Sequence, residues 1–425
     1  MRNKAKWTVL TYIAAHNNLD SFGRKSLNEI LTVGSNPEVV LTALYDGQIG
    51  GARYVMGEPG KVSWQETLGS FDSGDPDELI ATAKLLFGSN PADHYGLILW
   101  SHGTGWMPGE IEKVAAEARP GSQPDAAETR ERAGMPGSRT LFRSTLRAIL
   151  KPEKARERAI LFDDGTGHSL DTIELARVTK EIAQAIGQPL DLLGMDACLM
   201  ANVEVAYEIR KSVGFLVASE ELVPGHSWPY QDVFKGLQDE PDQSGADLAT
   251  SIVNRYVSFY TANPPSGGDV TKAAFDLSKV DELVSPIDQV ADQLVSSPDT
   301  YGDILWSVQH ATRERETSQG KRKPSKFDFH LWDVGSLIGG LAAAPKSSEE
   351  MIKKCRLALS SFAPGKGGPI LAAGHVGKWF DGTSGFSTYL MSPEQQRISP
   401  AYSQLAYARD THWYKMLQAY HKHFE

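Results

Sequence analysis

The sequence predicts an α/β fold organised around a mainly parallel sheet flanked by helices. Short apolar runs bounded by turn residues alternate with segments in which apolar residues recur every three or four positions. That alternation is typical of buried strands connected by amphipathic helices. We expect strands at residues 7–14, 39–45, 95–100, 190–195 and 215–218, with a small antiparallel excursion between residues 53 and 68.

Helices are predicted where the three- and four-residue spacing of apolar side chains persists. They cover residues 77–87, 170–186 and 202–211 in the first half, and 247–261, 278–294 and 347–361 in the second half, where short strands are expected at 273–277 and 386–390. The pattern changes near residue 241. We therefore expect a doubly wound unit over residues 1–240, with an α+β C-terminal subdomain over residues 241–425 packed on it.

Residues 107–158 form a separate stretch inside the first unit. They are dense in Arg, Ala, Glu, Gly and Pro, and their one sizeable apolar run covers residues 141–150. A segment of this composition can bury little apolar surface, so we expect an exposed insertion.

Composition and charge limit the classes of function. The 425 residues are 41% hydrophobic and 23% charged, which is ordinary for a folded soluble chain. The net charge of −10 argues against nucleic acid as a partner, because a binder of the phosphate backbone presents a basic surface. Since no apolar stretch approaches the ~20 residues that span a bilayer, we expect no membrane partner either.

Two cysteines, Cys198 and Cys355, are too few and too distant in sequence for a disulfide framework or a zinc knuckle. Cys355 lies on a predicted amphipathic helix, where we interpret it as a core residue. The apolar run near the N-terminus is rich in β-branched and aromatic residues, so we interpret it as the first strand and not as a signal peptide. Both observations favour a cytoplasmic location.

Two predicted strands end in residues that can do chemistry. The strand at 95–100 is followed by His102 and Gly103, and the strand at 190–195 by Asp196, Ala197 and Cys198. The carboxyl ends of parallel strands meet at one edge of the sheet, where ligands and substrates usually bind. Taken singly, each motif is more often structural. Their joint occurrence indicates a cysteine nucleophile with a histidine partner.

A cysteine nucleophile needs help to ionise. The attacking species is the thiolate, and an ordinary thiol with a pKa of ~8.5 is only partly ionised at neutral pH. The imidazole of His102 and the first amides of the helix at 202–211 could supply that help. Gly103 permits close approach of its backbone to a substrate, so its N–H and that of Cys198 are candidates for an oxyanion hole.

These motifs resemble the clostripain family of cysteine peptidases, within the caspase-like superfamily. That family is marked by an apolar block ending in His-Gly and a later one ending in Ala-Cys. The resemblance covers most of the chain and also includes residues 11–20, 218–228 and 385–390. It implies a caspase-like sheet and a Cys198–His102 dyad that cleaves peptide bonds after a basic residue through an acyl-enzyme. We expect no cofactor.

The resemblance also implies a pocket for the basic side chain. Asp196 matches the family position whose carboxylate lies in that pocket, where it could accept a guanidinium in a bidentate manner. Glu220 and Glu221, which follow the next predicted strand, are candidates for a second acidic wall. The expected partner is therefore a peptide or protein substrate with Arg or Lys at the cleavage site.

Two departures from the family pattern are visible. His16 stands where family members usually carry an acidic residue before Asn-Asn-Leu. The stretch at 107–158 falls where family members are often cut to mature, which suggests an activation segment that is self-processed after an arginine. The candidate positions are Arg119, Arg130, Arg132, Arg139, Arg143, Arg147, Arg156 and Arg158.

Other interpretations stay open. A catalytically idle relative that binds basic peptides or a regulatory partner is the main alternative, and a serine hydrolase is weaker because no Gly-x-Ser-x-Gly elbow is present. His94, His168 and His226 are rival imidazoles. Asp163, Asp164 and His168 could form a metal cluster, for which calcium would be the ion because most ligands are oxygens. We expect no metal as the simpler interpretation.

Overall fold

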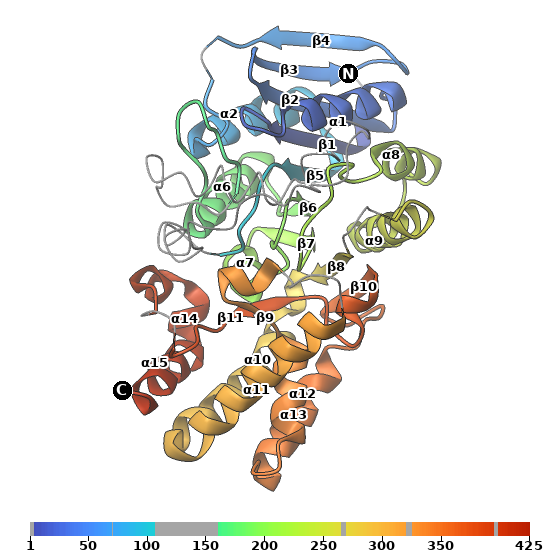
Figure 1. Ribbon diagram of the computed structural model, residues 1–425. Helices are drawn as coiled ribbons and strands as arrows, with labels where there is room; N and C mark the ends of the chain where they lie inside the picture. The colour runs from blue at the N-terminus through green and yellow to red at the C-terminus, as the bar shows by residue number, and fades with distance from the viewer. Residues whose placement is uncertain (1–3, 70, 107–159, 265–268, 320–324, 395–397) are drawn as a thin grey trace, which may run out of the picture.

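The computed structural model describes residues 4–69, 71–106, 160–264, 269–319, 325–394 and 398–425. The insertion predicted at 107–158, with its candidate arginines, lies outside the described residues. The described chain forms a central sheet with helices on both faces and a helical lobe beneath it, and the C-terminus lies in that lobe (Figure 1). The α/β fold predicted from the sequence is confirmed.

The sheet has nine strands in the order β10-β8-β7-β6-β5-β1-β2-β3-β4. Its parallel centre consists of the five predicted strands, which are β1 (Ala5–Ala14), β2 (Val39–Gly47), β5 (Ala92–Trp100), β6 (Leu190–Asp196) and β7 (Val213–Ala218). They are almost entirely buried because helices cover both faces, which explains their continuous apolar sequences.

Antiparallel strands complete both edges of the sheet. The predicted excursion forms β3 (Gly50–Met56) and β4 (Val62–Thr67) on one side. On the other side β8 (Val270–Asp276) pairs with β7, and β10 (Ile370–Val376) pairs with β8 at the edge of the sheet. The second half of the chain thus extends the sheet of the first half, and the predicted boundary at residue 241 falls between two helices of one sheet layer.

Two helical layers sandwich the sheet. One face is covered by α1 (Asp20–Val33), α8 (Tyr230–Asp239) and α9 (Gly245–Ala262), and the other by α2 (Pro76–Ser89), α6 (Thr172–Ile186) and α7 (Val203–Ile209). Capping residues determine where several of these helices begin and end. Asp171 and Glu174 form a reciprocal capping box at the start of α6, and Gly187 ends that helix in the left-handed conformation.

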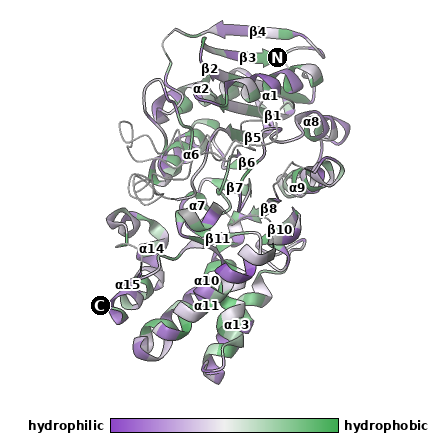
Figure 2. Cartoon of the chain, in the orientation of Figure 1, coloured by the Kyte–Doolittle hydropathy of each residue, from purple (hydrophilic) through white to green (hydrophobic). Residues whose placement is uncertain are grey.

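The lobe beneath the sheet contains two of the helices predicted from the second half, at 278–294 and 347–361, together with four helices that were not predicted. In chain order the helices of the lobe are α10 (Val280–Ser296), α11 (Pro298–Gln319), α12 (Val334–Ala343), α13 (Glu349–Ser361), α14 (Ala406–Asp410) and α15 (Trp413–His423), joined by the small pair β9 (Leu331–Asp333) and β11 (Ser387–Tyr389). Hydrophobic and hydrophilic residues both line these helices (Figure 2). Cys355 is fully buried on α13, as predicted. No helix in the described part of the chain has both the length and the apolar character needed to cross a bilayer.

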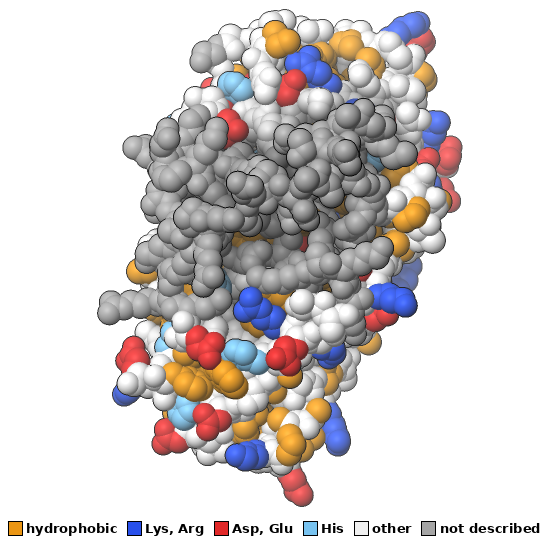
Figure 3. All heavy atoms as spheres, viewed as in Figure 1, with side chains coloured by type: hydrophobic (Ala, Val, Ile, Leu, Met, Phe, Trp, Pro, Cys, Tyr) orange, Lys and Arg blue, Asp and Glu red, His pale blue; other side chains and the backbone are white. Residues whose placement is uncertain are grey.

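Charged side chains are mixed on the surface. On the described part of the face in Figure 3, Lys and Arg lie among Asp and Glu, and neither sign gathers into one patch. One concentration of charge is internal. Lys326, in the short helix η3 (Ser325–Phe329), is fully buried with its ammonium against Glu220 and 2.9 Å from Glu316. Because Glu316 belongs to α11 and Glu220 follows β7, this cluster joins the lobe to the sheet.

Replacing Lys326 with Met should destabilise the protein strongly, because the substitution leaves two buried carboxylates without a counter-charge. Breaking a buried ion pair from one side costs about 3–5 kcal/mol. The check is thermal or urea unfolding of the full chain. Lys61→Met is the matched control, since Lys61 pairs with Glu58 on the exposed surface, where such a pair contributes ~0–1 kcal/mol. Equal losses in the two variants would contradict this assignment.

Candidate active site

The two predicted chemical motifs end neighbouring strands in matched register. Trp100 at the end of β5 pairs with Asp196 at the end of β6. Two residues further on, the chain places His102 and Cys198 at the same edge of the sheet. A side chain at residue 103 would put its Cβ 2.5 Å from the carbonyl oxygen of Cys198, so the close approach of the two loops requires Gly103.

His102 is buried and held from two directions. Its Nε2 lies 2.6 Å from Oδ1 of Asn18, and its ring meets Phe162 edge-on with centroids 5.9 Å apart. An amide oxygen only accepts hydrogen bonds, so with this amide orientation Nε2 carries the proton. The basic nitrogen of the neutral ring is then Nδ1.

Cys198 occupies a turn with a strained backbone. The next residue, Leu199, has φ of 66°, a conformation that residues with side chains rarely adopt. The sulfur accepts a hydrogen bond from the amide of Val223 at 3.3 Å. The sequence had suggested that α7 would supply such amides. Instead the side chain of Asn202 caps α7 by accepting from Val205, and the amide at the sulfur follows β7. Burial raises the pKa of the Cys198 thiol to about 12.

Asp196 has a buried carboxylate in which one oxygen accepts hydrogen bonds and the other has no hydrogen-bond partner. Its Oδ2 accepts hydrogen bonds from the hydroxyls of Ser227 and Tyr230 and from the amide of Trp228. Its Oδ1 is buried and has no hydrogen-bond partner. Trp228 reaches this position because residue 194 is glycine, where a Cβ would meet its ring at 2.7 Å. Burial raises the pKa of Asp196.

A buried lysine that the sequence analysis missed belongs to the same environment. Lys272, on β8, is fully buried, and its ammonium lies 4.2 Å from the ring centroid of Tyr256 and 4.9 Å from that of Trp228. Burial lowers the pKa of Lys272 to about 7, while the charges of Asp196 and Cys198 act in the opposite direction. Lys272 is therefore part of the electrostatic surroundings of Asp196.

Glu220 and Glu221 are both buried, directly after β7. Glu220 pairs with Lys326, and Glu221 accepts a hydrogen bond from the Lys326 amide at 3.2 Å. The backbone amides of both glutamates donate to the Thr271 hydroxyl of β8, at 3.0 and 3.1 Å. In this conformation Lys326 is the partner of both glutamates, although Oε2 of Glu220, like Oδ1 of Asp196, is buried without a hydrogen-bond partner.

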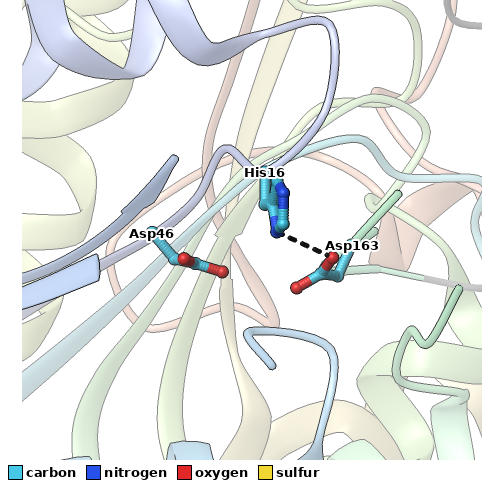
Figure 4. Close-up of side chains that lie close together, drawn as sticks. All are labelled: His16, Asp46 and Asp163. Carbon is cyan, nitrogen blue, oxygen red and sulfur yellow. Dashed lines mark ion pairs between the residues drawn. The ribbon is translucent and has the colours of Figure 1, made fainter. Parts of the chain in front are cut away.

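The rival histidines have other partners. His94 pairs with Asp191 at 2.8 Å near the amino ends of β5 and β6, opposite the edge that carries His102. His226 contacts Lys25 at 2.7 Å. His168 pairs with Asp72 and not with the neighbouring aspartates of its own loop. The metal cluster suggested at Asp163, Asp164 and His168 is therefore not assembled. Asp163 instead lies beside His16 and Asp46 (Figure 4).

Sequence reasoning found the two strand-end motifs but missed the residues that hold them. Asn18 had a usable signal, because it follows β1 at the same edge of the sheet as His102. Phe162 and Lys272 had none, since each looks like part of an ordinary strand or turn until the tertiary contacts are known. Together the described residues supply an oriented imidazole, a thiol and a buried carboxylate at one edge of the sheet, the requirements for nucleophilic acyl transfer.

Comparison with known proteins identifies the family. A model of the clostripain family matches residues 11–117 and 147–417, with a break inside the predicted insertion. No curated protein matches the chain. Among solved structures, a secreted C11 cysteine protease from Bacteroides thetaiotaomicron with an irreversible peptide inhibitor is similar at 19% identity and a TM-score of 0.59, covering 97% of this chain and 99% of that one. An inactive zymogen C11 protease from Parabacteroides distasonis is similar at 17% identity, with the same TM-score and coverage.

These structures share the fold over nearly the whole chain, and the family model matches well over half of the sequence. The resemblance inferred from the His-Gly and Ala-Cys motifs is thus confirmed. The protein belongs to the clostripain family and is a cysteine peptidase.

Proposed function

We propose that the protein is an endopeptidase that cleaves after Arg or Lys, with Cys198 as nucleophile and His102 as general base and acid. The observation that carries this proposal is the matched register of β5 and β6, which brings the two residues to one edge of the sheet. The hydrogen bond from His102 to Asn18 supports the assignment, because it leaves Nδ1 as the nitrogen that accepts the thiol proton.

The reaction follows from these roles. His102 takes the proton of the Cys198 thiol, and the thiolate attacks the peptide carbonyl carbon to form a tetrahedral oxyanion. Collapse of this intermediate breaks the C–N bond, the leaving amine takes the proton from His102, and a thioester remains on the sulfur. Water, deprotonated by His102, then hydrolyses the thioester and regenerates the thiol. The backbone N–H groups of Gly103 and Cys198 are the proposed oxyanion donors.

Preference for a basic residue is proposed to come from Asp196. Its open Oδ1 is a buried acceptor without a partner, which favours a substrate cation. In the described conformation Lys272 supplies the positive charge near this carboxylate, so a substrate guanidinium or ammonium would compete with an internal ammonium. Glu220 and Glu221 contribute to the negative surroundings but keep Lys326 as their partner.

Peptides that carry Arg or Lys before a reporter group should be cleaved, and Cys198→Ala or His102→Ala should lower kcat by orders of magnitude.

Asp196→Asn should lower kcat/KM for the basic peptides by at least ~100-fold while changing cleavage of a norleucine peptide little, because the carboxylate acts on the substrate charge. The ratio of the two kcat/KM values is the measurement.

Cys355→Ala is the control for the loss of a thiol, since Cys355 is buried in the lobe on α13. An unchanged Arg-to-norleucine ratio in Asp196→Asn would remove Asp196 from the specificity pocket. Binding of basic peptides without turnover in the wild type would favour the idle relative that binds but does not cleave.

Asn18 is proposed to position the imidazole. Asn18→Ala should lower kcat by about 10- to 100-fold, less than the ~10²–10⁴ that a general acid–base group contributes, and leave KM nearly unchanged. Asn18→Asp keeps the acceptor and adds a negative charge that favours the imidazolium. It should recover most of kcat and move the acidic limb of the pH–rate profile to higher pH. A profile identical to that of the wild type would contradict the contact.

We further propose that the uncut chain is a latent form that is activated by self-cleavage within residues 107–158. Two observations support latency. Burial raises the pKa of the Cys198 thiol in this conformation, so a smaller share of it is ionised than of an ordinary thiol. A similar solved structure is titled an inactive zymogen of a C11 protease.

Incubated wild type should acquire a cut after one arginine of this segment, and Cys198→Ala should stay intact. In a Cys355→Ser background, iodoacetamide should label Cys198 at least ~100-fold faster in the cut form than in the uncut form at pH 8. Mass spectrometry reads both the cut and the label. Cutting in neither chain, or in both equally, would show that self-processing is wrong.

A further inference from the structure

Three side chains from separate segments converge beside the candidate active site. His16 follows β1, Asp46 lies near the end of β2, and Asp163 lies in the loop before α6. One ligand atom from each, the imidazole nitrogen and two carboxylate oxygens, lies within 4.8 Å of the others. Figure 4 shows the two carboxylates pointing toward the same gap, with the His16 ring beside it.

Asp46 gives this cluster an open ligand atom. The residue is only 2% exposed, and its Oδ2 is buried without a hydrogen-bond partner. A carboxylate oxygen in that position loses its hydration and gains nothing in return, which costs free energy unless a cation or a proton occupies the gap. The direction of the side chain into the cluster therefore indicates a positively charged occupant.

Asp163 is already held in the orientation of a ligand. Its Oδ1 accepts from the amides of Gly165 at 2.7 Å and Thr166 at 3.1 Å, and its Oδ2 from the amide of Ser73 at 3.2 Å. The His16 ring packs directly against Gly165, where a Cβ would lie 2.2 Å from the ring. Hydrogen bonds of this kind orient the ligands of metal sites.

The ligand set selects the class of ion. An imidazole with two carboxylates suits Zn²⁺ and related divalent transition ions, whereas Ca²⁺ takes six to eight oxygen ligands. Ligands ~2.0–2.1 Å from a tetrahedral ion lie about 3.3–3.4 Å from each other. Nδ1 of His16 lies 3.2 Å from Oδ1 of Asp163, close to that spacing.

The cluster is connected to both contacts of His102. His16 precedes Asn18 by two residues, and Asp163 directly follows Phe162. The side-chain amide of Asn17 bridges the two loops by donating to the carbonyl of Phe162 at 2.7 Å and to that of Ala14 at 3.2 Å. The amide of Asp164 in turn donates to the His16 carbonyl at 2.9 Å. An ion bound by both loops would fix the two side chains that orient the imidazole.

We propose that His16, Asp46 and Asp163 bind a divalent transition-metal ion of the Zn²⁺ class, which holds together the two loops that position His102. The ion takes no part in bond cleavage. The site itself does not depend on the proposed peptidase specificity, because its ligands are distinct from Cys198, His102 and Asp196.

The experiment uses the full chain with Cys198→Ala, so that zinc cannot bind the thiol and binding is measured without activity. After dialysis against a chelator, Zn²⁺ is titrated by calorimetry, and metal content is measured by elemental mass spectrometry. We expect one equivalent of Zn²⁺ and a rise in Tm of about 2–5 °C at saturation. Asp46→Asn and His16→Ala should each weaken binding by at least ~10-fold, and His16→Asp should shift preference from Zn²⁺ toward Ca²⁺.

His168→Ala is the matched control, because His168 forms an imidazole–carboxylate pair with Asp72 in the adjoining turn, and no third ligand joins this pair among the described residues. It should leave the zinc stoichiometry and affinity unchanged. His16 is partly exposed, so its variants test the site even where Asp46→Asn fails to fold. Absence of bound zinc in the parent, or equal binding by parent and His16→Ala, would overturn the proposal and leave the cluster as two carboxyls that share a proton.

Discussion

The parallel pairing of β5 with β6 is the constraint on which the candidate site depends. The pair fixes Trp100 opposite Asp196, and the two loops that leave the sheet there carry His102 and Cys198 to a common edge. Gly103 lets the loops approach because a side chain at that position would collide with the Cys198 backbone. The strained turn at Leu199 lies directly after Cys198 in the second of these loops. The geometry thus comes from a rigid sheet and not from the loops alone.

Burial of charge is the second feature of this edge. Asp196, Lys272, Glu220 and Lys326 are all buried, and each carboxylate has a cation in its surroundings. In a medium of low dielectric constant such charges need compensation, so a substrate cation entering near Asp196 changes the balance of the whole group. Burial also raises the pKa of the Cys198 thiol. The proposed specificity and the proposed latency therefore have a common physical origin.

The strands and the two motifs could be predicted because their signals are local. A buried parallel strand gives a continuous apolar run, and a reactive residue directly after it lies at the carboxyl edge of the sheet. Other elements gave weak signals. The α1 and α11 helices (Asp20–Val33 and Pro298–Gln319) are rich in polar residues, and β10 is a glycine- and alanine-containing edge strand.

The contacts that complete the site could not be predicted because they join distant segments. Lys272 is a single lysine within an apolar strand, and its proximity to Asp196 depends on the pairing of β8 with β7. The cluster of His16, Asp46 and Asp163 spans three segments. The sequence analysis considered a metal cluster of Asp163, Asp164 and His168 because these residues are close in sequence, but the turn directs His168 to Asp72. Proximity in sequence was a poor guide there because a tight turn sends successive side chains in different directions.

The most direct test of the central claim is a crystal structure of the cut protein after reaction with an arginyl chloromethyl ketone. The account predicts a covalent bond to the Cys198 sulfur, His102 Nδ1 within hydrogen-bond reach of the reacting centre, and the guanidinium of the inhibitor on Asp196. An adduct on another residue, or a His102 ring turned away from the sulfur with its arginyl group far from Asp196, would contradict it.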